Sequence, residues 1–257
     1  MLVLLSCAKT MSAVSKVKVP LTTSPRFQKE AAGRALQMSQ FSVDELERLL
    51  RVNAKIAVEN YKRYQAFHAE ATPELPALLA YTGIVFKRLN PKDFSAEDFG
   101  YAQEHLRLTS FCYGLLRPLD VIRAYRLEGD VVLPELGNQT LFFYWRSRLT
   151  DTFIEDIRSA GGILCNLASD EMKSLFDWKR VESEVRVVTP EFHVWKNGKL
   201  ATIVVYTKMS RGEMTRFILK NKIGNPEELK GFSWEGFEFD ESLSDERKLV
   251  FINGMGE

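Results

Sequence analysis

Three apolar runs of strand length are each followed at once by polar and charged residues. Ligand sites in mixed sheets favour the ends of strands. If the ends of these three runs are neighbours, we expect the polar residues that follow them to lie close together. Cations beside carboxylates there indicate a phosphate site with an acid/base pair, or equally a buried ion-pair network without catalysis. The runs and followers are Leu2–Leu5 with Ser6–Thr10, Ile163–Leu167 with Asp170 and Glu171, and Ile203–Tyr206 with Lys208 and Arg211. The candidate catalytic residues are Lys9, Asp170 and Glu171.

Other reactive side chains are few. The 257 residues include three cysteines and three histidines, and none of these falls in a metal-ligand spacing. The sequence contains no HExxH, Walker, GxGxxG or GxSxG motif. We therefore expect no bound metal and no cofactor. Cys7 beside Lys9 could carry a thiol of low pKa, but a small apolar filler after a strand is the favoured interpretation.

Charge is balanced overall but unevenly distributed along the chain. Lys and Arg number 35 and Asp and Glu 34, so composition alone predicts no polyanionic partner. Residues 107–126 and 208–222 are basic, whereas residues 227–247 are acidic. Solvated helix faces partly paired with the acidic region explain this pattern as well as a phosphate-attracting cleft does. The residues expected on one concave positive surface are Lys9, Arg107, Arg117, Arg126, Lys208, Arg211 and Arg216.

Periodicity, caps and turn residues predict the elements that position these side chains. Helices are expected at about 43–68 with a break near 53, at 95–117, at 140–160 and at 209–222. Strands are expected at 2–5, 163–167, 184–195, 200–206, 237–240 and 249–252. Asn197-Gly198 is typical of a type I′ turn, which predicts a β-hairpin near 184–206. The chain is thus expected to be α+β (mixed α/β), with a mixed sheet and flanking helices in a single domain, 1–257.

The N-terminus and the cysteines bear on the compartment. Leu2–Leu5 is too short for the 7–15 apolar residues of a signal peptide, so we interpret it as a strand. No run of 18 apolar residues occurs, so no membrane partner is expected. The cysteine usage agrees with a reducing environment, and the expected localisation is cytoplasmic.

Seven short motifs follow one another along the chain. They are Ser6–Thr10, Phe99–Leu108 running into Tyr113–Asp120, Tyr125–Glu128, Tyr144-Trp145, Asn166–Glu171, Arg211–Phe217, and Gly231-Phe232 with Glu235–Phe237. Through these motifs the sequence resembles the YaaA peroxide-stress protein family over essentially its whole length. One position departs from the pattern, because the family more often has proline where this chain has Cys7. That departure weakens Cys7 as a required nucleophile.

The resemblance implies a cytoplasmic bacterial protein of the hydrogen peroxide stress response that limits damage from unincorporated iron. It also implies a distinctive mixed α/β fold in which a positively charged cleft and a helix-hairpin-helix-like element suggest DNA binding. Such an element donates backbone N–H groups to phosphates independently of base sequence. The best candidate is 78–89, with its turn at Gly83 and Lys87 after it, and an ordinary helix–turn–helix connection is the equal alternative.

The leading hypothesis is an oxidative-stress protein that binds double-stranded DNA with low sequence specificity. The alternative is an enzyme acting on a phosphorylated or nucleotide-like small molecule at Lys9, Asp170, Lys208 and Arg211. A third hypothesis is a protein-interaction factor that uses its acidic region, 227–247. A narrow pocket with converging charges would favour the enzyme, and a long open groove would favour DNA.

Overall fold

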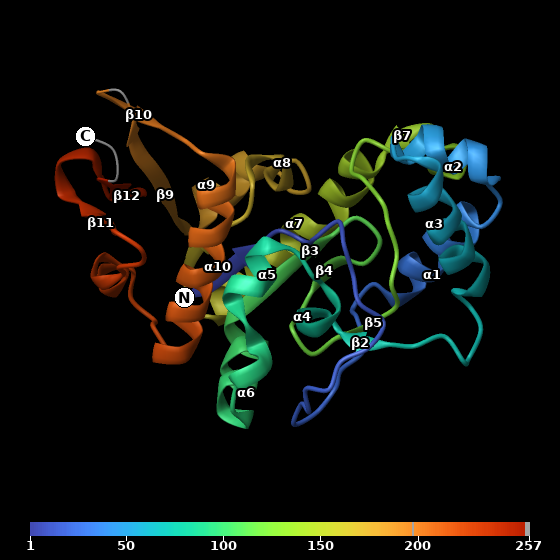
Figure 1. Cartoon of the computed structure of the whole chain (residues 1–257), viewed down its shortest axis with the longest axis horizontal. Coiled ribbons are helices and arrows are strands. Elements are labelled where there is room, and N and C mark those ends of the chain that lie inside the picture. The colour runs from blue at the N-terminus through green and yellow to red at the C-terminus, as the bar shows by residue number, and fades with distance from the viewer. Residues whose placement is uncertain (197, 255–257) are drawn as a thin grey trace.

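The sheet at the centre of the molecule is mixed, and it gives the chain the expected α+β fold (Figure 1). The computed structural model describes residues 1–196 and 198–254. In sheet order the strands are β11 (Phe237–Asp240), β12 (Lys248–Asn253), β9 (Arg186–Lys196), β8 (Ile163–Asn166), β1 (Leu2–Leu5), β3 (Leu106–Ser110) and β4 (Gly114–Leu116), with β10 (Lys199–Ala201) paired to β9. Two small sheets pair β2 (Leu75–Pro76) with β5 (Val121–Ile122), and β6 (Val132–Leu133) with β7 (Gln139–Thr140).

The middle of the sheet is parallel and its outer pairs are antiparallel. Val3 of β1 lies opposite Leu106 of β3 on one side and Cys165 of β8 on the other, both in parallel register. β9 runs parallel to β8, and β12 parallel to β9. β4, β10 and β11 each join by antiparallel pairing. The carboxyl ends of β1 and β8 therefore meet at the same edge of the sheet.

β1 is buried along its whole length. Its four residues, Leu2–Leu5, are at most 1% exposed. Strands inside a parallel sheet have both faces covered, so they are continuous apolar runs rather than alternating ones. The interpretation of Leu2–Leu5 as a strand is confirmed.

The helices surround this sheet. They are α1 (Gln28–Met38), α2 (Val43–Leu50), α3 (Ala54–Ala66), α4 (Ala77–Ala80), α5 (Ile84–Leu89), α6 (Ala96–His105), α7 (Leu141–Ser159), α8 (Asp170–Lys173), α9 (Trp178–Glu184) and α10 (Val204–Asn221). Short 3₁₀ helices occur at Pro91–Asp93, Pro134–Leu136, Pro226–Gly231 and Glu241–Leu243. In Figure 1, α1–α3 gather at one end of the molecule, β11 and β12 lie at the other, and α5 lies beside α10. No helix in the described ranges is long and apolar enough to cross a membrane.

Several predicted helix boundaries are confirmed by their caps. Ser42 and Glu45 form the expected capping box at the start of α2. The break near residue 53 lies between α2 and α3, where Arg51 is left-handed with φ 50°. The Thr140 hydroxyl accepts a hydrogen bond from the Phe143 N–H at 3.3 Å and so caps α7, and the chain turns at Gly161, where φ is +103°.

Two predicted elements are wrong. Residues 203–206 do not form a strand, because α10 begins at Val204 and packs along α5. The helix from Ser95 ends at His105, since Leu106–Ser110 pairs with β1 as strand β3. The expected hairpin is confirmed as β9 with β10, although Asn197 of its predicted turn lies outside the described residues.

Candidate functional site

A pocket of about 310 Å³ opens where the carboxyl ends of β1 and β8 meet. Leu5 at the end of β1 and residues 6–10 after it form one wall, and Leu167, Ser169, Glu171 and Met172 after β8 contribute a second. The start of α5 and the loop 125–128 line the other sides. Lys208 and Arg211 reach it from α10. A cavity therefore lies at the strand ends where a site was predicted, and its third contributor is a helix rather than the predicted strand.

Two serines fasten the loops that follow β1 and β8. The Ser6 hydroxyl oxygen accepts a hydrogen bond from the Ser169 N–H at 2.9 Å, and the two hydroxyl oxygens lie 3.2 Å apart. The Leu167 N–H donates to the Leu4 carbonyl at 3.0 Å and continues the parallel ladder. These bonds fix the backbone around the pocket, so its lining side chains start from defined positions.

Glu128 holds two of the cations in the pocket. Its carboxylate is 3.0 Å from Lys9 Nζ and 2.9 Å from Arg126 Nε. The Arg126 guanidinium also donates from Nη1 to the carbonyl of Lys9 at 3.1 Å. This part of the site is an ion-pair network, as one of the two hypotheses for the strand ends predicts.

Arg211 belongs to no such network. Its Nε is buried, and its side chain has no hydrogen-bond or ion-pair partner within residues 1–196 and 198–254. Burial lowers the pKa of the guanidinium, and the charge of Asp170 opposes that shift. A buried donor without an acceptor costs about 1–3 kcal/mol, and more when it is charged. Arg211 is therefore a cation whose hydrogen-bonding capacity within the pocket is unused.

Gly212 sets how closely α10 approaches α5. A Cβ atom at this position would overlap the carbonyl oxygen of Val85 and lie 2.8 Å from the Cβ of Arg88. The absence of a side chain allows the two helices to touch. Because Arg211 is the preceding residue, this contact also fixes its distance from the opposite wall of the pocket.

We expect Gly212→Ala to lower the free energy of unfolding by about 1–3 kcal/mol through overpacking. Chemical denaturation of the two proteins measures this loss. Gly33→Ala is the matched control, because Gly33 lies within α1 and nothing stands within 4 Å of its added Cβ. The control should be stabilised by roughly 0.5–1 kcal/mol. A Gly212→Ala protein as stable as the wild type would contradict the close helix contact.

The three candidate catalytic residues are only partly brought together. Lys9 and Glu171 line the pocket. Asp170 is outside the lining, with its side chain 92% exposed and its carboxylate 2.8 Å from Lys173 Nζ. Desolvation raises the pKa of the Cys7 thiol to about 12, so this thiol stays protonated at neutral pH. The packing interpretation of Cys7 is therefore favoured over a reactive one.

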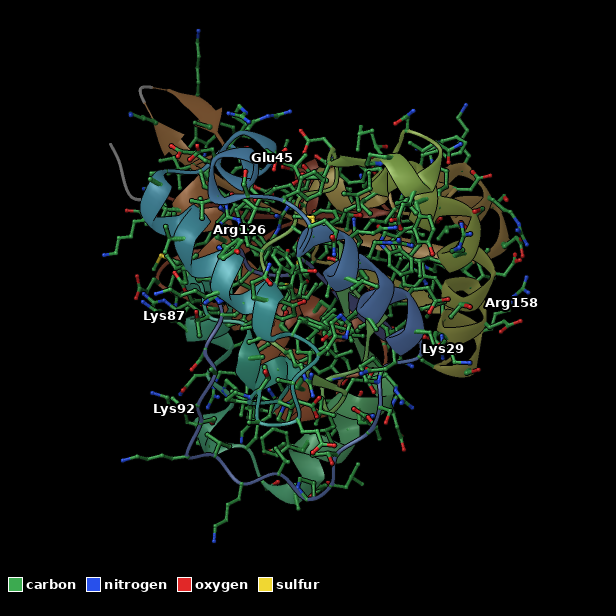
Figure 2. All side chains as sticks on the ribbon, turned by 90° about the vertical axis from the view of Figure 1, so that its right-hand side faces the viewer. Lys29, Glu45, Lys87, Lys92, Arg126 and Arg158 are labelled. Carbon is green, nitrogen blue, oxygen red and sulfur yellow. The ribbon has the colours of Figure 1, made fainter. Side chains whose placement is uncertain are left out.

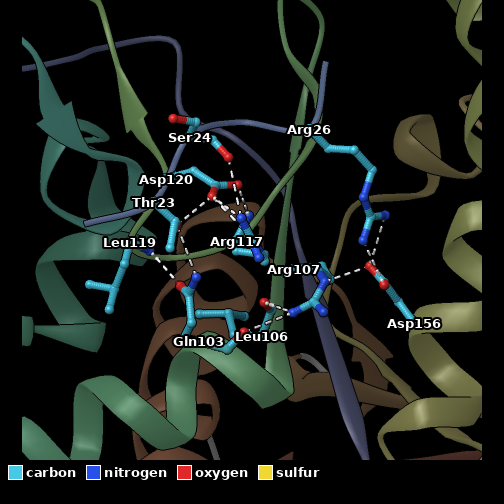
Figure 3. A network of polar contacts seen from close by, with 10 residues as sticks. All are labelled: Thr23, Ser24, Arg26, Gln103, Leu106, Arg107, Arg117, Leu119, Asp120 and Asp156. Carbon is cyan, nitrogen blue, oxygen red and sulfur yellow. Dashed lines mark hydrogen bonds and ion pairs between the residues drawn. The ribbon is translucent and has the colours of Figure 1, made fainter. Parts of the chain in front are cut away.

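Three arginines predicted for the same positive surface lie elsewhere, each in an ion pair. Arg107 is 2.7 Å from Asp156, Arg117 is 2.9 Å from Asp120, and Arg216 is 2.5 Å from Asp93. Figure 3 shows the first two as parts of an internal polar network. The structure thus joins Lys9, Arg126, Lys208 and Arg211 in one pocket and does not extend that surface to the other three.

A second, larger cavity lies on the outer side of α5. It has a volume of about 1010 Å³ and is lined by Ser12, residues 14–18, the end of α4, Tyr81, Thr82, Phe86, Lys87, residues 90–92 and Phe94. We call it the lysine groove, because its charged lining residues are Lys16, Lys18, Lys87 and Lys92. All four lysines are exposed, and none of their side chains has an ion-pair or hydrogen-bond partner within the described ranges. Figure 2 shows Lys87 and Lys92 on one side of the molecule, and Lys29 and Arg158 on the other.

The predicted hairpin lies between this groove and the pocket. Two short helices, α4 and α5, are joined by residues 81–83. Gly83 borders the pocket and Lys87 the groove. Gly83 has φ 173°, an extended conformation that any residue adopts, so its backbone does not require glycine. The residues predicted from the sequence included Lys87 but not Lys16, Lys18 or Lys92. The signal that could have found the first two is that Lys16 and Lys18 have no acidic residue near them in the sequence.

No group of three or more His, Cys, Asp or Glu side chains within residues 1–196 and 198–254 is arranged to hold a metal ion. The Nδ1–H of His105 donates a hydrogen bond to the carbonyl of Met1 at 3.0 Å, and its ring stacks on Tyr101 with ring centroids 4.1 Å apart. Both contacts are packing contacts at the end of α6.

Fold and site together define an α+β protein with two cation-lined cavities on either side of α5. The chain belongs to the family described as peroxide stress protein YaaA, whose model matches residues 1–243. It is 98% identical over 257 residues to a UPF0246 protein of Bacteroides thetaiotaomicron, with both chains fully covered. UPF0246 proteins of Phocaeicola vulgatus and Saccharophagus degradans are 63% and 34% identical, each with 98% of both chains covered. The family agrees with the resemblance of the motifs and with a role in oxidative stress.

Proposed function

We propose that this peroxide stress protein binds double-stranded DNA, with little sequence preference, through the lysine groove. The observation that carries the proposal is a cavity whose charged lining, among the residues that the structure describes, consists of lysines. Lysines neutralise phosphates and release condensed counterions, which is the sequence-independent part of DNA affinity. A side chain without an internal partner is available for that contact without first breaking an ion pair.

The pocket at the strand ends is a poorer candidate for a duplex. Its volume is about 310 Å³, and carboxylates of Glu128 and Glu171 line it beside the cations. Carboxylates facing a phosphate backbone would repel it. The lysine groove is larger, and no carboxylate from the described part of the chain lines it, which agrees better with a polyanion.

The same contacts offer a route to limiting damage from unincorporated iron. DNA carries a condensed layer of cations, and bound lysines displace part of it. Iron(II) within that layer would be displaced with the other cations. Peroxide would then meet less iron at the DNA, so protection would follow from binding and needs no iron storage.

A salt titration of duplex binding tests the proposal. Four lysine–phosphate contacts give a slope of log affinity against log salt near −3.6, or a loss on the order of 100-fold between 50 and 200 mM salt. Replacing Lys16, Lys18, Lys87 and Lys92 by alanine should flatten the slope by about 0.9 for each true contact. Fluorescence anisotropy with two unrelated duplexes of equal length measures slope and sequence preference together.

The matched control removes the same charge elsewhere. Lys29, Lys55, Lys62 and Lys179 are exposed, lie on α1, α3 and α9, and have no ion-pair partner among the described residues. Replacing these four lysines by alanine should leave the slope of log affinity against log salt largely unchanged. If the two variants flatten the slope equally, the salt dependence reflects only the net charge of the protein and not the groove. An interaction that does not depend on salt would contradict the proposal outright.

A further inference from the structure

We infer that the pocket at the carboxyl ends of β1 and β8 is a binding site for a phosphomonoester, the dianionic phosphate end of a small organic molecule or of a DNA strand. This inference goes beyond the proposed function. The cations that line the pocket are different residues from the lysines of the groove. The experiment on the pocket can therefore contradict this inference without contradicting DNA binding by the groove, and the reverse is also true.

The charge of the pocket matches a dianion. Its lining cations are Lys9, Arg126, Lys208 and Arg211, and its lining carboxylates are Glu128 and Glu171, which leaves a formal charge of +2. A phosphomonoester carries roughly −1.5 to −2 near neutral pH, whereas a phosphodiester in a DNA backbone carries −1. The excess of positive charge is thus of the size that one terminal phosphate neutralises.

The cations divide into a fixed pair and a free pair. Lys9 and Arg126 are both held by Glu128 and form one side of the site. Lys208 and Arg211 come from one turn of α10, and their side chains have no hydrogen-bond or ion-pair partner within residues 1–196 and 198–254. A planar guanidinium donates paired hydrogen bonds to phosphate oxygens. The Arg211 guanidinium lines the pocket without a partner in residues 1–196 and 198–254, so it is the donor group available to such a ligand.

The rest of the lining fits the organic part of the ligand. Apolar side chains of Leu5, Phe86, Phe111, Leu127 and Met172 complete the walls. Small-molecule sites are mostly apolar, with a few convergent polar groups, and begin at about 300 Å³. The pocket of about 310 Å³ fits one nucleotide or a similar phosphorylated molecule and excludes a duplex. The carboxylate of Glu171 also lines the pocket and would accept hydrogen bonds from ligand hydroxyl groups.

Calorimetric titration of the full-length protein with thymidine 5′-monophosphate, and with thymidine as the matched probe, tests the site. Two charge-assisted contacts at about 1.5–3 kcal/mol each predict that the monophosphate binds at least on the order of 100-fold more tightly. Arg211→Ala should weaken the monophosphate roughly 10- to 100-fold, and Arg211→Lys should restore part of the loss. Lys208→Ala should also weaken it, and because this side chain is exposed, its removal leaves folding intact.

Two controls separate the site from its surroundings. Arg158→Ala removes an arginine on the opposite side of the molecule from Arg126 and should change nothing (Figure 2). The fourfold lysine variant of the groove should keep its affinity for the mononucleotide. Equal binding of thymidine and its monophosphate, or wild-type affinity in both Arg211→Ala and Lys208→Ala, would overturn the inference.

A nicked duplex identifies the source of the phosphate. If the ligand is a DNA end, a nick with a 5′-phosphate binds more tightly than one with a 5′-hydroxyl, and Arg211→Ala abolishes the difference. If the ligand is a free nucleotide, the two nicks bind alike while the mononucleotide still binds. Either result supports a phosphomonoester site. If the protein distinguishes neither the two nicks nor thymidine from its monophosphate, the inference is overturned.

Discussion

Replacing Arg107 by alanine is expected to lower the free energy of unfolding by about 3–5 kcal/mol, the typical loss when one partner of a buried ion pair is removed. The Arg107 side chain is only 9% exposed, and its Nε lies 2.7 Å from the Asp156 carboxylate. Its Nη1 also donates to the carbonyls of Gln103 and Leu106, at 3.1 and 2.9 Å (Figure 3). Alanine would leave the Asp156 charge buried with a weaker partner. Urea unfolding at neutral pH measures the loss.

Arg26→Ala is the matched control for this prediction. Arg26 also pairs with Asp156, at 3.1 Å, but its side chain is 43% exposed. Solvent-exposed ion pairs contribute about 0–1 kcal/mol, so this variant should lose much less. Equal losses in the two variants would contradict the buried role of Arg107.

The Arg107 effect should depend on pH in a defined direction. Burial alone raises the pKa of Asp156, but hydrogen bonds and charge from Arg107 and Arg26 outweigh it and lower the pKa. A carboxyl group with a lowered pKa in the folded protein stabilises it above its unfolded pKa of about 3.9. That stabilisation is lost as pH falls through the folded pKa. The difference between wild type and Arg107→Ala should therefore narrow below about pH 4.

Local sequence signals were sufficient for elements that carry their own boundaries. Leu2–Leu5 and Ile163–Leu167 are apolar runs without periodicity, as buried parallel strands require. The capping box of Ser42 and the Thr140 cap mark helix starts through bonds within four residues. These features need no information about the rest of the chain, so the sequence alone predicts them.

Tertiary contacts decided the elements that were predicted wrongly. Ile203-Val204-Val205-Tyr206 is rich in β-branched residues, yet it begins α10, which lies against α5 through Gly212. Leu106–Ser110 continues an apolar pattern that suits a helix, yet it pairs with β1. The secondary-structure propensity of a residue contributes less free energy than tertiary packing of this kind. The packing partners cannot be identified from local sequence patterns.

Charge runs were the least reliable guide to the candidate site. In the sequence the stretch 107–126 sets only Asp120 against its four arginines, but in the fold Glu74, Glu128 and Asp156 pair with them as well. Among the described residues, no acid from 227–247 forms an ion pair with this stretch. By contrast, the side chains of Lys16 and Lys18 have no partner within residues 1–196 and 198–254. A surplus of charge along the sequence therefore marks a binding surface only where the fold brings no opposite charge to it.

Plasmid DNA exposed to iron(II) and hydrogen peroxide is expected to be nicked more slowly in the presence of the protein, in proportion to the fraction of DNA that it covers. The reason is the displacement of condensed cations by the lysines of the groove. The variant that lacks Lys16, Lys18, Lys87 and Lys92 should give no protection at salt concentrations where it no longer binds. The variant that lacks Lys29, Lys55, Lys62 and Lys179 should protect like the wild type. Gel quantification of supercoiled and nicked plasmid measures the rates.

Chelated iron separates displacement from simple covering of the DNA. An iron–EDTA complex is anionic and does not join the condensed cation layer, so radicals form in solution rather than at the phosphates. Protection by displacement should therefore be strong with free iron(II) and weak with the chelate. Equal protection against both would mean that the protein only covers DNA, which would contradict the iron part of the proposal and leave DNA binding standing. Protection that survives the loss of the four groove lysines would instead move the DNA contact away from the groove.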